Sequence, residues 1–314
     1  MTASLDIIIV NWNAGGQLRD SLESINNAAN RDDFELYRVV VVDNASTDCS
    51  ANGLKDLRLP LTIIRNKENR GFAPACNQGA KRSRADYLLF LNPDTRLFAD
   101  SLWRPISFME EPGHEYIGIC GVKVQEKSGR MTTSCARFPT LRLMFGKMTG
   151  LYRLFPKLFP RHFLAESECT HSMEVDQVIG AFFLVRKSVF DALHGFDERF
   201  FVYFEEVDFS LRAKQKGFAS YYLCDVSIFH RGGGITENVK SIRLFYSLRS
   251  GIIYGFKNFR YLHAIALALL TLSVELMARI IRSAISFSFS QFLETIGGYK
   301  RLFIYFIGRV FKWK

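Results

Sequence analysis

Residues 88–95 (LLFLNPDT) place an amide, a proline and a carboxylate directly after an apolar run. Pro93 cannot donate to a sheet ladder and it restricts Asn92, so a strand should end here. Ligands of open α/β sheets bind at the carboxyl ends of the strands. The pattern therefore predicts Asp94 as a ligand of a metal ion or a phosphate. An Asx-type turn that merely closes the strand is the alternative.

Three acids, Glu205, Glu206 and Asp208, follow the aromatic segment FFVYF. They fall in the first turn of a helix predicted to begin near residue 205 and to end at Gly217. Favourable charge at the positive end of the helix dipole is one explanation. A carboxylate walled by aromatic rings has a raised pKa and suits proton abstraction, so the cluster also predicts a general base.

His230 follows a strand predicted over residues 221–229 and precedes Gly232-Gly233-Gly234, which we expect to be a mobile loop. A lone histidine is usually structural. At a strand end beside a glycine loop it is also a candidate metal ligand.

These groups need a framework, which the first ninety residues indicate. Apolar runs at 5–10, 38–42, 61–65 and 87–91 alternate with stretches of helical length at 16–29, 48–58 and 73–84. This alternation predicts an α/β fold with a mostly parallel sheet covered by helices. Each strand is followed by polar side chains, which should share one edge of the sheet: Asn11 and Asn13, then Asp43, then Asn69, then Asn92.

The same edge could bind a nucleotide, although neither G-x-G-x-x-G nor a P-loop pattern is present. Asp43 can accept the imide N–H of a uracil or thymine ring. The loop Asn69-Arg70-Gly71 can approach a ligand closely because glycine has no Cβ.

Two later regions have less distinct patterns. Residues 100–172 read as a long surface excursion, either a covering segment or an acceptor-side flap with Arg142, Lys147, Arg153 and Lys157 near phosphates or lipid headgroups. Residues 178–185 read as another buried strand, which Gly180-Ala181 would open to a backbone or a ligand.

The whole net charge of +10 lies in residues 238–314, where twelve Lys and Arg face only Glu275 and Glu294. Residues 262–278 are apolar, but His263 and Glu275 reduce the uninterrupted core to about eleven residues, short of a membrane span. Interfacial helices on an anionic membrane surface explain both features. Nucleic-acid binding and a soluble core or oligomer interface are the alternatives. Six scattered cysteines and no signal peptide indicate a reducing cytoplasm.

Six segments in order resemble the inverting family-2 glycosyltransferases of GT-A fold, particularly the bacterial rhamnosyltransferase-like branch. They are VVDNASTD, NRGFAPACNQGA, FLNPDT, GAFFLVRKSVFDALHGFDERF, FVYFEEVDFSLR and VSIFHRGGG. The resemblance covers about residues 5–235. It implies a glycosyltransferase domain over 1–237, followed by a helical membrane-associating region over 238–314.

The resemblance also implies roles for single residues. Asp43 would read the pyrimidine base, with Asn69, Arg70, Gly71 and Asn77 beside the nucleotide. Asp94 and His230 would hold Mg²⁺ or Mn²⁺, and Glu206 takes the position of the catalytic base. Two departures stand out: Asn92 replaces the first acid of the D-x-D motif, and Glu206 replaces an aspartate, which leaves Glu205 and Asp208 as alternatives.

The expected activity is transfer of a sugar from a dTDP or UDP donor to a lipid-linked saccharide in surface polysaccharide synthesis, with dTDP-rhamnose as the favoured donor. The expected location is peripheral, at the cytoplasmic face of the inner membrane, and no nucleic acid is involved. A UDP-hexose or galactofuranose donor is one alternative. A non-catalytic nucleotide-sugar-binding scaffold is the other.

Overall fold

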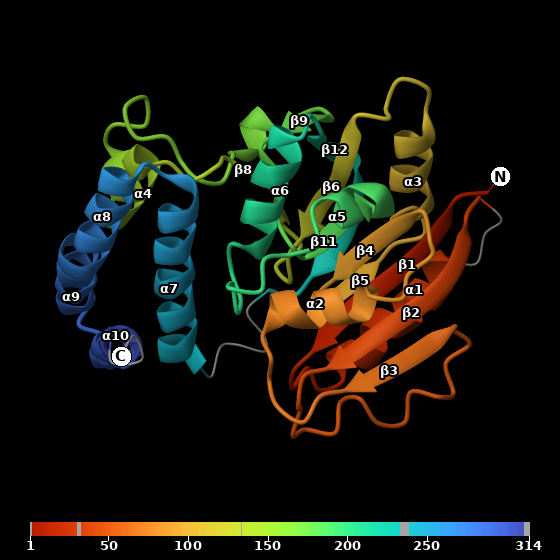
Figure 1. The fold of residues 1–314 in the computed structure, drawn as a ribbon, viewed down its shortest axis with the longest axis horizontal. Coiled ribbons are helices and arrows are strands. Elements are labelled where there is room, and N and C mark those ends of the chain that lie inside the picture. The colour runs from red at the N-terminus through yellow and green to blue at the C-terminus, as the bar shows by residue number, and fades with distance from the viewer. Residues whose placement is uncertain (1, 30–32, 133, 233–238, 311–314) are drawn as a thin grey trace. The chain divides into compact units, whose positions relative to one another are not determined.

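The computed structural model describes residues 2–29, 33–132, 134–232 and 239–310. They form two compact units (Figure 1). Unit 1 comprises Met1–Phe138, Phe163–Glu198 and Glu205–Ile235, and unit 2 comprises Pro139–His162, Arg199–Phe204 and Thr236–Lys314. The middle segment 139–162 thus groups with the C-terminal helices, while the domain boundary at 237 stays a prediction.

Unit 1 is built on a sheet with the strand order β3-β2-β1-β4-β11-β6-β12-β5. The strands of this path are β1 (Ser4–Asn11), β2 (Glu35–Asp43), β3 (Leu61–Arg65), β4 (Tyr87–Leu91), β5 (Thr95–Leu97), β6 (Ile117–Gln125), β11 (Phe182–Arg186) and β12 (Ala219–His230). Of these, β11 and β5 run antiparallel to their neighbours, and the other pairs are parallel. The predicted mostly parallel α/β sheet is confirmed, as are the four N-terminal strands.

Short strands complete the unit: β7 (Met131–Thr132) and β9 (Met173–Val175) at the main sheet, and β8 (Cys135–Ala136) paired with β10 (Gln177–Val178). The helices are α1 (Gln17–Ala28), α2 (Phe72–Ala80), α3 (Trp103–Glu110), the 3-10 helix η2 (Glu166–Glu168), α5 (Lys187–Ala192) and α6 (Glu205–Gln215). The helix predicted from 205 to Gly217 is confirmed, and Gly217 ends it with a φ of 88°.

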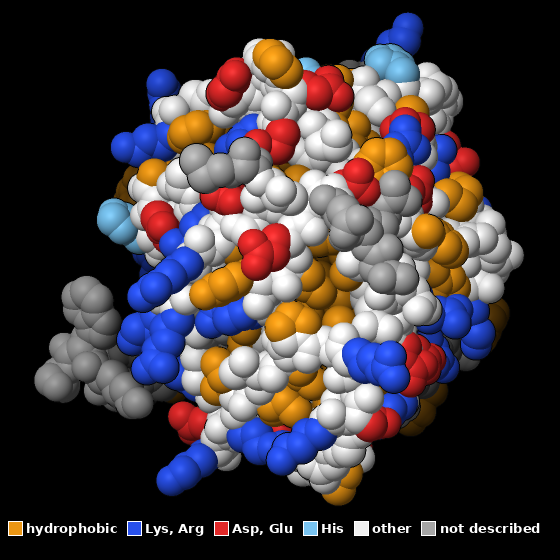
Figure 2. Space-filling model, turned by 90° about the vertical axis from the view of Figure 1, so that its right-hand side faces the viewer, with side chains coloured by type: hydrophobic (Ala, Val, Ile, Leu, Met, Phe, Trp, Pro, Cys, Tyr) orange, Lys and Arg blue, Asp and Glu red, His pale blue; other side chains and the backbone are white. Residues whose placement is uncertain are grey.

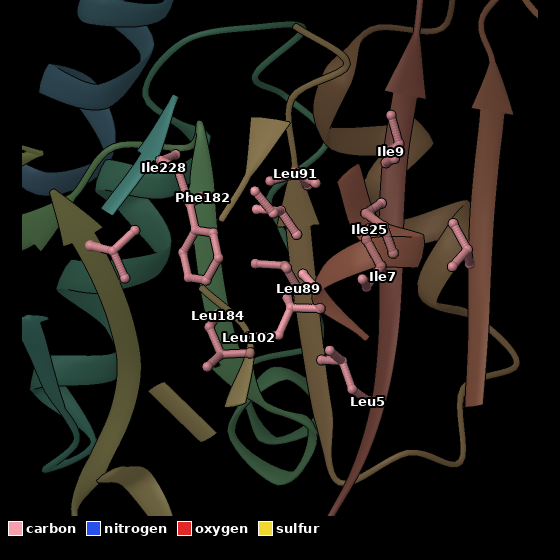
Figure 3. Packing of buried hydrophobic residues seen from close by; sticks show 14 of the residues in the cluster. Leu5, Ile7, Ile9, Ile25, Leu89, Leu91, Leu102, Phe182, Leu184 and Ile228 are labelled. Carbon is pink, nitrogen blue, oxygen red and sulfur yellow. The ribbon is translucent and has the colours of Figure 1, made fainter. Parts of the chain in front are cut away.

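Alternate residues of each strand enter two cores, one on each face of the sheet. Ile7 and Ile9 of β1 pack with Ile25 of α1 and with Leu89 and Leu91 of β4 (Figure 3). The residues between them belong to the second core, which also contains buried residues of α2, α5 and α6. Helices α1 and α3 therefore cover one face, and α2, α5 and α6 cover the other.

The helix predicted over residues 48–58 is wrong. This stretch forms turns, in which Cys49 (φ 58°) and Gly53 (φ 65°) have left-handed backbone. The Asp48 carboxylate accepts from the backbone N–H groups of Ser50 (3.0 Å) and Gly15 (2.7 Å). Such local side-chain bonds compete with the helical ladder, and here they win.

Interpretation of residues 100–172 as a surface excursion is also wrong in part. Strand β6 lies inside the sheet between β11 and β12, and residues 117–122 are buried. Gly121 of β6 faces Val178, and a Cβ on Gly121 would lie 2.6 Å from two carbons of that side chain. The strand owes its place to this close tertiary packing, which its local sequence does not reveal.

Replacing Gly121 by Ala should destabilise the protein by about 1–3 kcal/mol, because the added methyl group overlaps the branched Val178 side chain. Gly180→Ala is the matched control, since a Cβ there meets nothing within 4 Å. Urea unfolding of both variants measures the difference. Equal midpoints for the two variants would contradict the packing described here.

Charge is divided unevenly between the two units. Residues 1–237 balance to zero, but six of their Lys and Arg, in segments 139–162 and 199–204, belong to unit 2. The face shown in Figure 2 carries basic and acidic side chains interspersed, with hydrophobic side chains between them. Unit 1 is therefore net negative, and unit 2 carries the whole positive excess.

Unit 2 is helical. Its elements are α4 (Leu141–Thr149), the 3-10 helix η1 (Leu151–Arg153), α7 (Lys240–Asn258), α8 (Tyr261–Leu270), the π-helix η4 (Thr271–Glu275), α9 (Leu276–Ile285) and α10 (Phe289–Val310). Leu248 and Ile252 of α7 form a small core with Tyr299 and Leu302 of α10.

The segments α8, η4 and α9 form one helix, Tyr261–Ile285, of 25 residues, and an 18-residue window within it has a mean hydropathy of 2.0. By length and composition it is long and apolar enough to cross a membrane, so the expectation that this stretch is too short for a span is not confirmed. The run between His263 and Glu275 is eleven residues, as predicted, but the apolar helix continues past Glu275, whose Oε1 accepts from Arg279 Nε (3.0 Å) and from a terminal nitrogen of Arg279 (2.7 Å).

Candidate active site

The ends of β1 and β2 form a cluster of polar side chains centred on Asn11. Asn11 pairs with Asp43 in register, and both side chains are buried. The Asn11 Nδ2 group donates to Asp43 Oδ1 (2.9 Å), Ser46 Oγ (3.0 Å) and Ser50 Oγ (2.8 Å). Asp43 Oδ2 lies 3.6 Å from a guanidinium nitrogen of Arg65, the next residue across the sheet. The predicted convergence of Asn11 and Asp43 is thus present.

Asn13 is tied to the loop after β2. Its backbone N–H donates to Ser46 Oγ (2.9 Å), and its Oδ1 accepts from the backbone N–H of Thr47 (2.7 Å). The residue has a φ of 55°, a left-handed conformation that asparagine tolerates better than most residues.

The loop after β3 is held by Asn44, the residue that follows Asp43. The Asn44 Nδ2 group donates to Asn69 Oδ1 (3.0 Å) and to the Gly71 carbonyl (2.9 Å), while its Oδ1 accepts from the Arg70 backbone N–H (3.2 Å). Gly71 needs its φ of 92°, which other residues rarely adopt. Asn69, Arg70 and Gly71 therefore lie beside the residue that follows Asp43. The motif DNASTD contains Asn44 and Ser46, and Ser50 lies two residues after it. This motif was the sequence signal that could have identified these residues.

Asn77 lies in a different environment. Its Nδ2 donates to the Phe196 carbonyl (2.8 Å) and to Glu198 Oε1 (3.1 Å), and its Oδ1 accepts from the Phe196 N–H (2.9 Å). A Cβ on Gly195 would lie 2.5 Å from Asn77 Oδ1. The Asn77 amide thus fastens the loop after α5 to α2. Among the described residues no hydrogen bond joins this amide to Asn11 or Asp43.

Asp94 and His230 meet at the antiparallel pairing of β5 with β12. Asp94 Oδ1 lies 3.2 Å from His230 Nε2, and Asn92 Nδ2 lies 3.3 Å from the same nitrogen. The Asp94 carbonyl also accepts from the Arg231 N–H (3.1 Å). In the described part of the chain no group of three His, Cys, Asp or Glu could hold a metal ion. One carboxylate oxygen and one imidazole nitrogen this close fit a divalent cation that takes its remaining ligands from phosphate and water.

Glu205 and Glu206 begin α6. Burial raises the pKa of Glu205 well above its ordinary value of 4.5, and the adjacent Glu206 adds to the rise. Burial also raises the pKa of Glu206, against the effect of backbone N–H donors. The Oε2 atom of each has no hydrogen-bond partner among the described residues. Electrostatic coupling to Cys76 places Glu205 beside α2.

Asp208 lies one turn further along α6 and is fully buried. Arg212 donates from Nε to Asp208 Oδ2 (2.8 Å), and its terminal nitrogens donate to the carbonyls of Leu193 (2.7 Å) and Gly195 (2.9 Å). Asp208 thus orients an arginine that holds the turn after α5. Its Oδ2 therefore belongs to a structural ion pair with Arg212.

The two residues before α6, Tyr203 and Phe204, have φ values of 68° and 72°. Consecutive left-handed conformations in bulky residues are strained, and such strain concentrates at functional sites. Here it sets where α6 begins, and therefore where Glu205 and Glu206 lie.

The raised pKa of Glu205 makes a prediction about stability. A carboxyl group whose pKa is higher in the folded state stabilises that state fully at low pH, and this contribution is lost as the pH rises from 4.5 through the raised pKa. Glu205→Gln stays neutral, so its free energy of unfolding relative to wild type should increase with pH, by up to about 1.4 kcal/mol for each pH unit crossed.

Chemical denaturation between pH 4 and pH 8, about the range in which a raised carboxyl pKa acts, measures this difference. Glu35→Gln is the control, because Glu35 is exposed. A difference between Glu205→Gln and wild type that does not change with pH would show that Glu205 is not desolvated in the folded protein.

Comparison with known proteins identifies the family. The protein-family model described as Glycosyl transferase family 2 matches residues 6–193, more than half of the chain. The chain belongs to glycosyl transferase family 2. The predicted resemblance is therefore confirmed, and so is the prediction of a glycosyltransferase.

Similar curated proteins include two rhamnosyltransferases. This family-2 glycosyltransferase is 24% identical over 250 residues to the N-acetylglucosaminyl-diphospho-decaprenol L-rhamnosyltransferase of Mycobacterium tuberculosis, covering 73% of this chain and 76% of that protein. It is 28% identical over 239 residues to the rhamnosyltransferase WbbL of Escherichia coli, covering 71% and 81%.

Solved structures confirm the GT-A fold. A mannosyltransferase from Pyrobaculum calidifontis, in complex with GDP-Man and Mn²⁺, superposes with a TM-score of 0.56 at 15% identity, over 95% of this chain and 86% of that chain. Residues 1–349 of S. aureus TarS superpose with a TM-score of 0.52 at 14% identity, over 97% and 92%.

Proposed function

We propose that this glycosyltransferase transfers rhamnose from dTDP-rhamnose to a lipid-linked saccharide, working from the cytoplasmic side of a membrane. The observation that carries the proposal is its similarity to two rhamnosyltransferases, one of which is named for a saccharide carried on diphospho-decaprenol. The long apolar helix Tyr261–Ile285 supports a membrane location for the acceptor.

In this proposal the cluster at the ends of β1 and β2 binds the nucleoside. Asn11 holds Asp43 Oδ1 at 2.9 Å and so orients the carboxylate. The carboxylate accepts the imide N–H that thymine and uracil share and cytosine lacks. Asn13 and the loop Asn69-Arg70-Gly71 supply backbone and polar groups around the sugar and diphosphate.

Asp94 and His230 would hold a divalent cation, with Asn92 beside them. Such an ion supplies positive charge that stabilises a departing diphosphate. Mn²⁺ in the structure of the archaeal mannosyltransferase supports its use here.

Glu206 acts as the general base. Its carboxylate takes the proton of the acceptor hydroxyl while the hydroxyl oxygen bonds to the anomeric carbon and the bond from that carbon to the diphosphate breaks. One displacement of this kind inverts the anomeric configuration and releases the nucleoside diphosphate. Its raised pKa makes the carboxylate a stronger base than an exposed glutamate.

A panel of sugar nucleotides tests the donor. We expect dTDP-rhamnose to be consumed fastest in the presence of Mn²⁺ and a polyprenyl-diphosphate saccharide. Faster use of a UDP-hexose or UDP-galactofuranose would keep the enzyme and reject the rhamnose donor.

Asp43→Asn should weaken binding of dTDP about 100-fold. The substitution replaces a charged acceptor by an amide that can turn a donor toward the imide N–H, and an unpaired buried donor costs one to two orders of magnitude in affinity. The Asn11 hydrogen bond can persist, since the new amide retains an oxygen. Calorimetric titration with dTDP measures the loss.

Asp56→Asn is the matched control, because Asp56 is exposed and pairs with Arg19. Unchanged dTDP affinity in Asp43→Asn would show that the thymine ring binds elsewhere.

A further inference from the structure

Unit 2 contains two adjoining cavities with basic walls. One of about 250 Å³ lies among α4, α7, η4 and α9, and the other, of about 390 Å³, lies among α7, α9 and α10. Arg279 and Arg282 line both of them. Across the two cavities six cationic side chains face two acids, namely Lys147, Arg153, Lys240, Arg243, Arg279 and Arg282 against Glu275 and Glu294. This excess of positive charge indicates an anionic ligand.

Lys147 is the most informative of these cations. Its ammonium group lines the smaller cavity, and the side chain is more than a third exposed. The nearby Glu275 carboxylate is paired with Arg279, which contacts it through two nitrogens. Among the described residues no acid lies within 4 Å of the Lys147 ammonium group. An anion that enters the cavity can therefore contact Lys147 without displacing a counter-ion.

The wall that carries Glu275 has an unusual backbone. Residues Thr271–Glu275 form a π-helical turn between α8 and α9, and Tyr299 donates from its hydroxyl to the Thr271 carbonyl (2.8 Å). Thr271 and Glu275 both line the smaller cavity. Short π-helical turns inside α-helices are rare and are frequent at functional sites.

The same helices are apolar on their outer surface. Leu262, Leu269, Met277, Ile281 and Ile285 are each more than half exposed. Arg282 of the cavities directly follows Ile281. A ligand that suits both surfaces has a phosphate group joined to a hydrocarbon chain, because cations bind the first and an apolar face contacts the second.

We propose that the basic cavities of unit 2, bounded by Lys147, Arg279 and Arg282, bind the diphosphate of the lipid acceptor. The inference rests on the proposed function, which requires such a lipid. It adds a second binding site to the chain, formed by residues of unit 2 alone and separate in composition from the Asp43 and Asp94 clusters of unit 1.

Binding of geranylgeranyl diphosphate to the full chain in uncharged detergent tests the assignment. We expect Lys147→Met and Arg282→Gln each to weaken binding about tenfold, as loss of one charge-assisted contact would. Lys300→Gln, an exposed charge on α10 that lines neither cavity, should bind as wild type does. Lys147 is more than a third exposed, so Lys147→Met should keep the thermal stability of wild type.

Two further probes identify the source of the phosphate. Inorganic pyrophosphate should bind more weakly than geranylgeranyl diphosphate, and vesicles with phosphatidylglycerol should bind Lys147→Met as well as wild type. Equal affinity for pyrophosphate would make this a site for a free anion. Loss of vesicle binding in Lys147→Met would make it a site for bulk phospholipid. Unchanged geranylgeranyl diphosphate affinity in both variants would remove the site altogether.

Titration with dTDP on the same samples separates this inference from the proposed function. Lys147-dependent lipid binding without any sugar transfer would overturn the proposed function and leave the lipid diphosphate site in place. Sugar transfer combined with equal lipid affinity in wild type, Lys147→Met and Arg282→Gln would overturn the lipid diphosphate site. The proposed function would then stand.

Discussion

Replacing Glu206 by Gln is expected to slow sugar transfer by about 10²- to 10⁴-fold while leaving donor binding unchanged. Glutamine keeps the size of the side chain but cannot take a proton from the acceptor hydroxyl. Glu206 lies in the first turn of α6 with Oε2 buried and no hydrogen-bond partner among the described residues, so its proton-accepting oxygen is not committed to the fold.

Glu205→Gln is the comparison that assigns the base. Glu205 is the adjacent residue, is buried, and also has a raised pKa and a buried Oε2 atom. If Glu206 is the base, Glu205→Gln should retain transfer within about tenfold. A larger loss in Glu205→Gln than in Glu206→Gln would exchange the two roles.

The pH profile gives an independent check. Because a base must be deprotonated and burial raises the pKa of Glu206, the transfer rate should begin to fall at a higher pH than for an ordinary carboxylate as the solution is acidified. This acid limb should be absent from the residual activity of Glu206→Gln.

The second large effect is expected at Asp94. Asp94→Asn should weaken Mn²⁺-dependent donor binding at least about 100-fold, because it removes the one carboxylate beside His230 in this cluster. Asn92 occupies the place where the D-x-D motif has its first acid, so Asp94 is the carboxylate that this cluster offers among the described residues. Titration of dTDP with and without Mn²⁺ measures the effect.

Asp100→Asn serves as its control, since Asp100 pairs only weakly with Arg104 at 3.5 Å. In the Asp94 variant, binding without Mn²⁺ should change little. Persistence of the full Mn²⁺ enhancement in Asp94→Asn would move the metal away from β5 and β12.

Much of the fold could be predicted from the sequence because its strands are continuous apolar runs. Val39–Val42 and Ile7–Ile9 can only be buried on both faces, which fixes parallel strands and therefore a shared edge for Asn11 and Asp43. The site residues nearest that edge were found for this reason. The role of Asn44, whose amide donates to Asn69 and to the Gly71 carbonyl, was not predicted.

The failures have physical causes. Strand β6 depends on the contact of Gly121 with Val178, which lie far apart in the sequence. The turns at 48–58 depend on carboxylate bonds to backbone N–H groups. The spacing of Asp208 and Arg212 was in principle readable, because side chains four residues apart on a helix are neighbours. The predicted mobility of the loop at Gly232–Gly234 lies largely outside the described residues.

The most direct test of the proposed function is mass spectrometry of the lipid product. The full chain is incubated with dTDP-rhamnose, Mn²⁺ and a polyprenyl-diphosphate N-acetylglucosamine, and Glu206→Gln is run beside it. We predict that wild type adds one deoxyhexose to the lipid and releases dTDP, and that the variant does neither at a comparable rate. A lipid left unchanged by wild type with dTDP-rhamnose, but extended with another sugar nucleotide, would contradict the proposed donor.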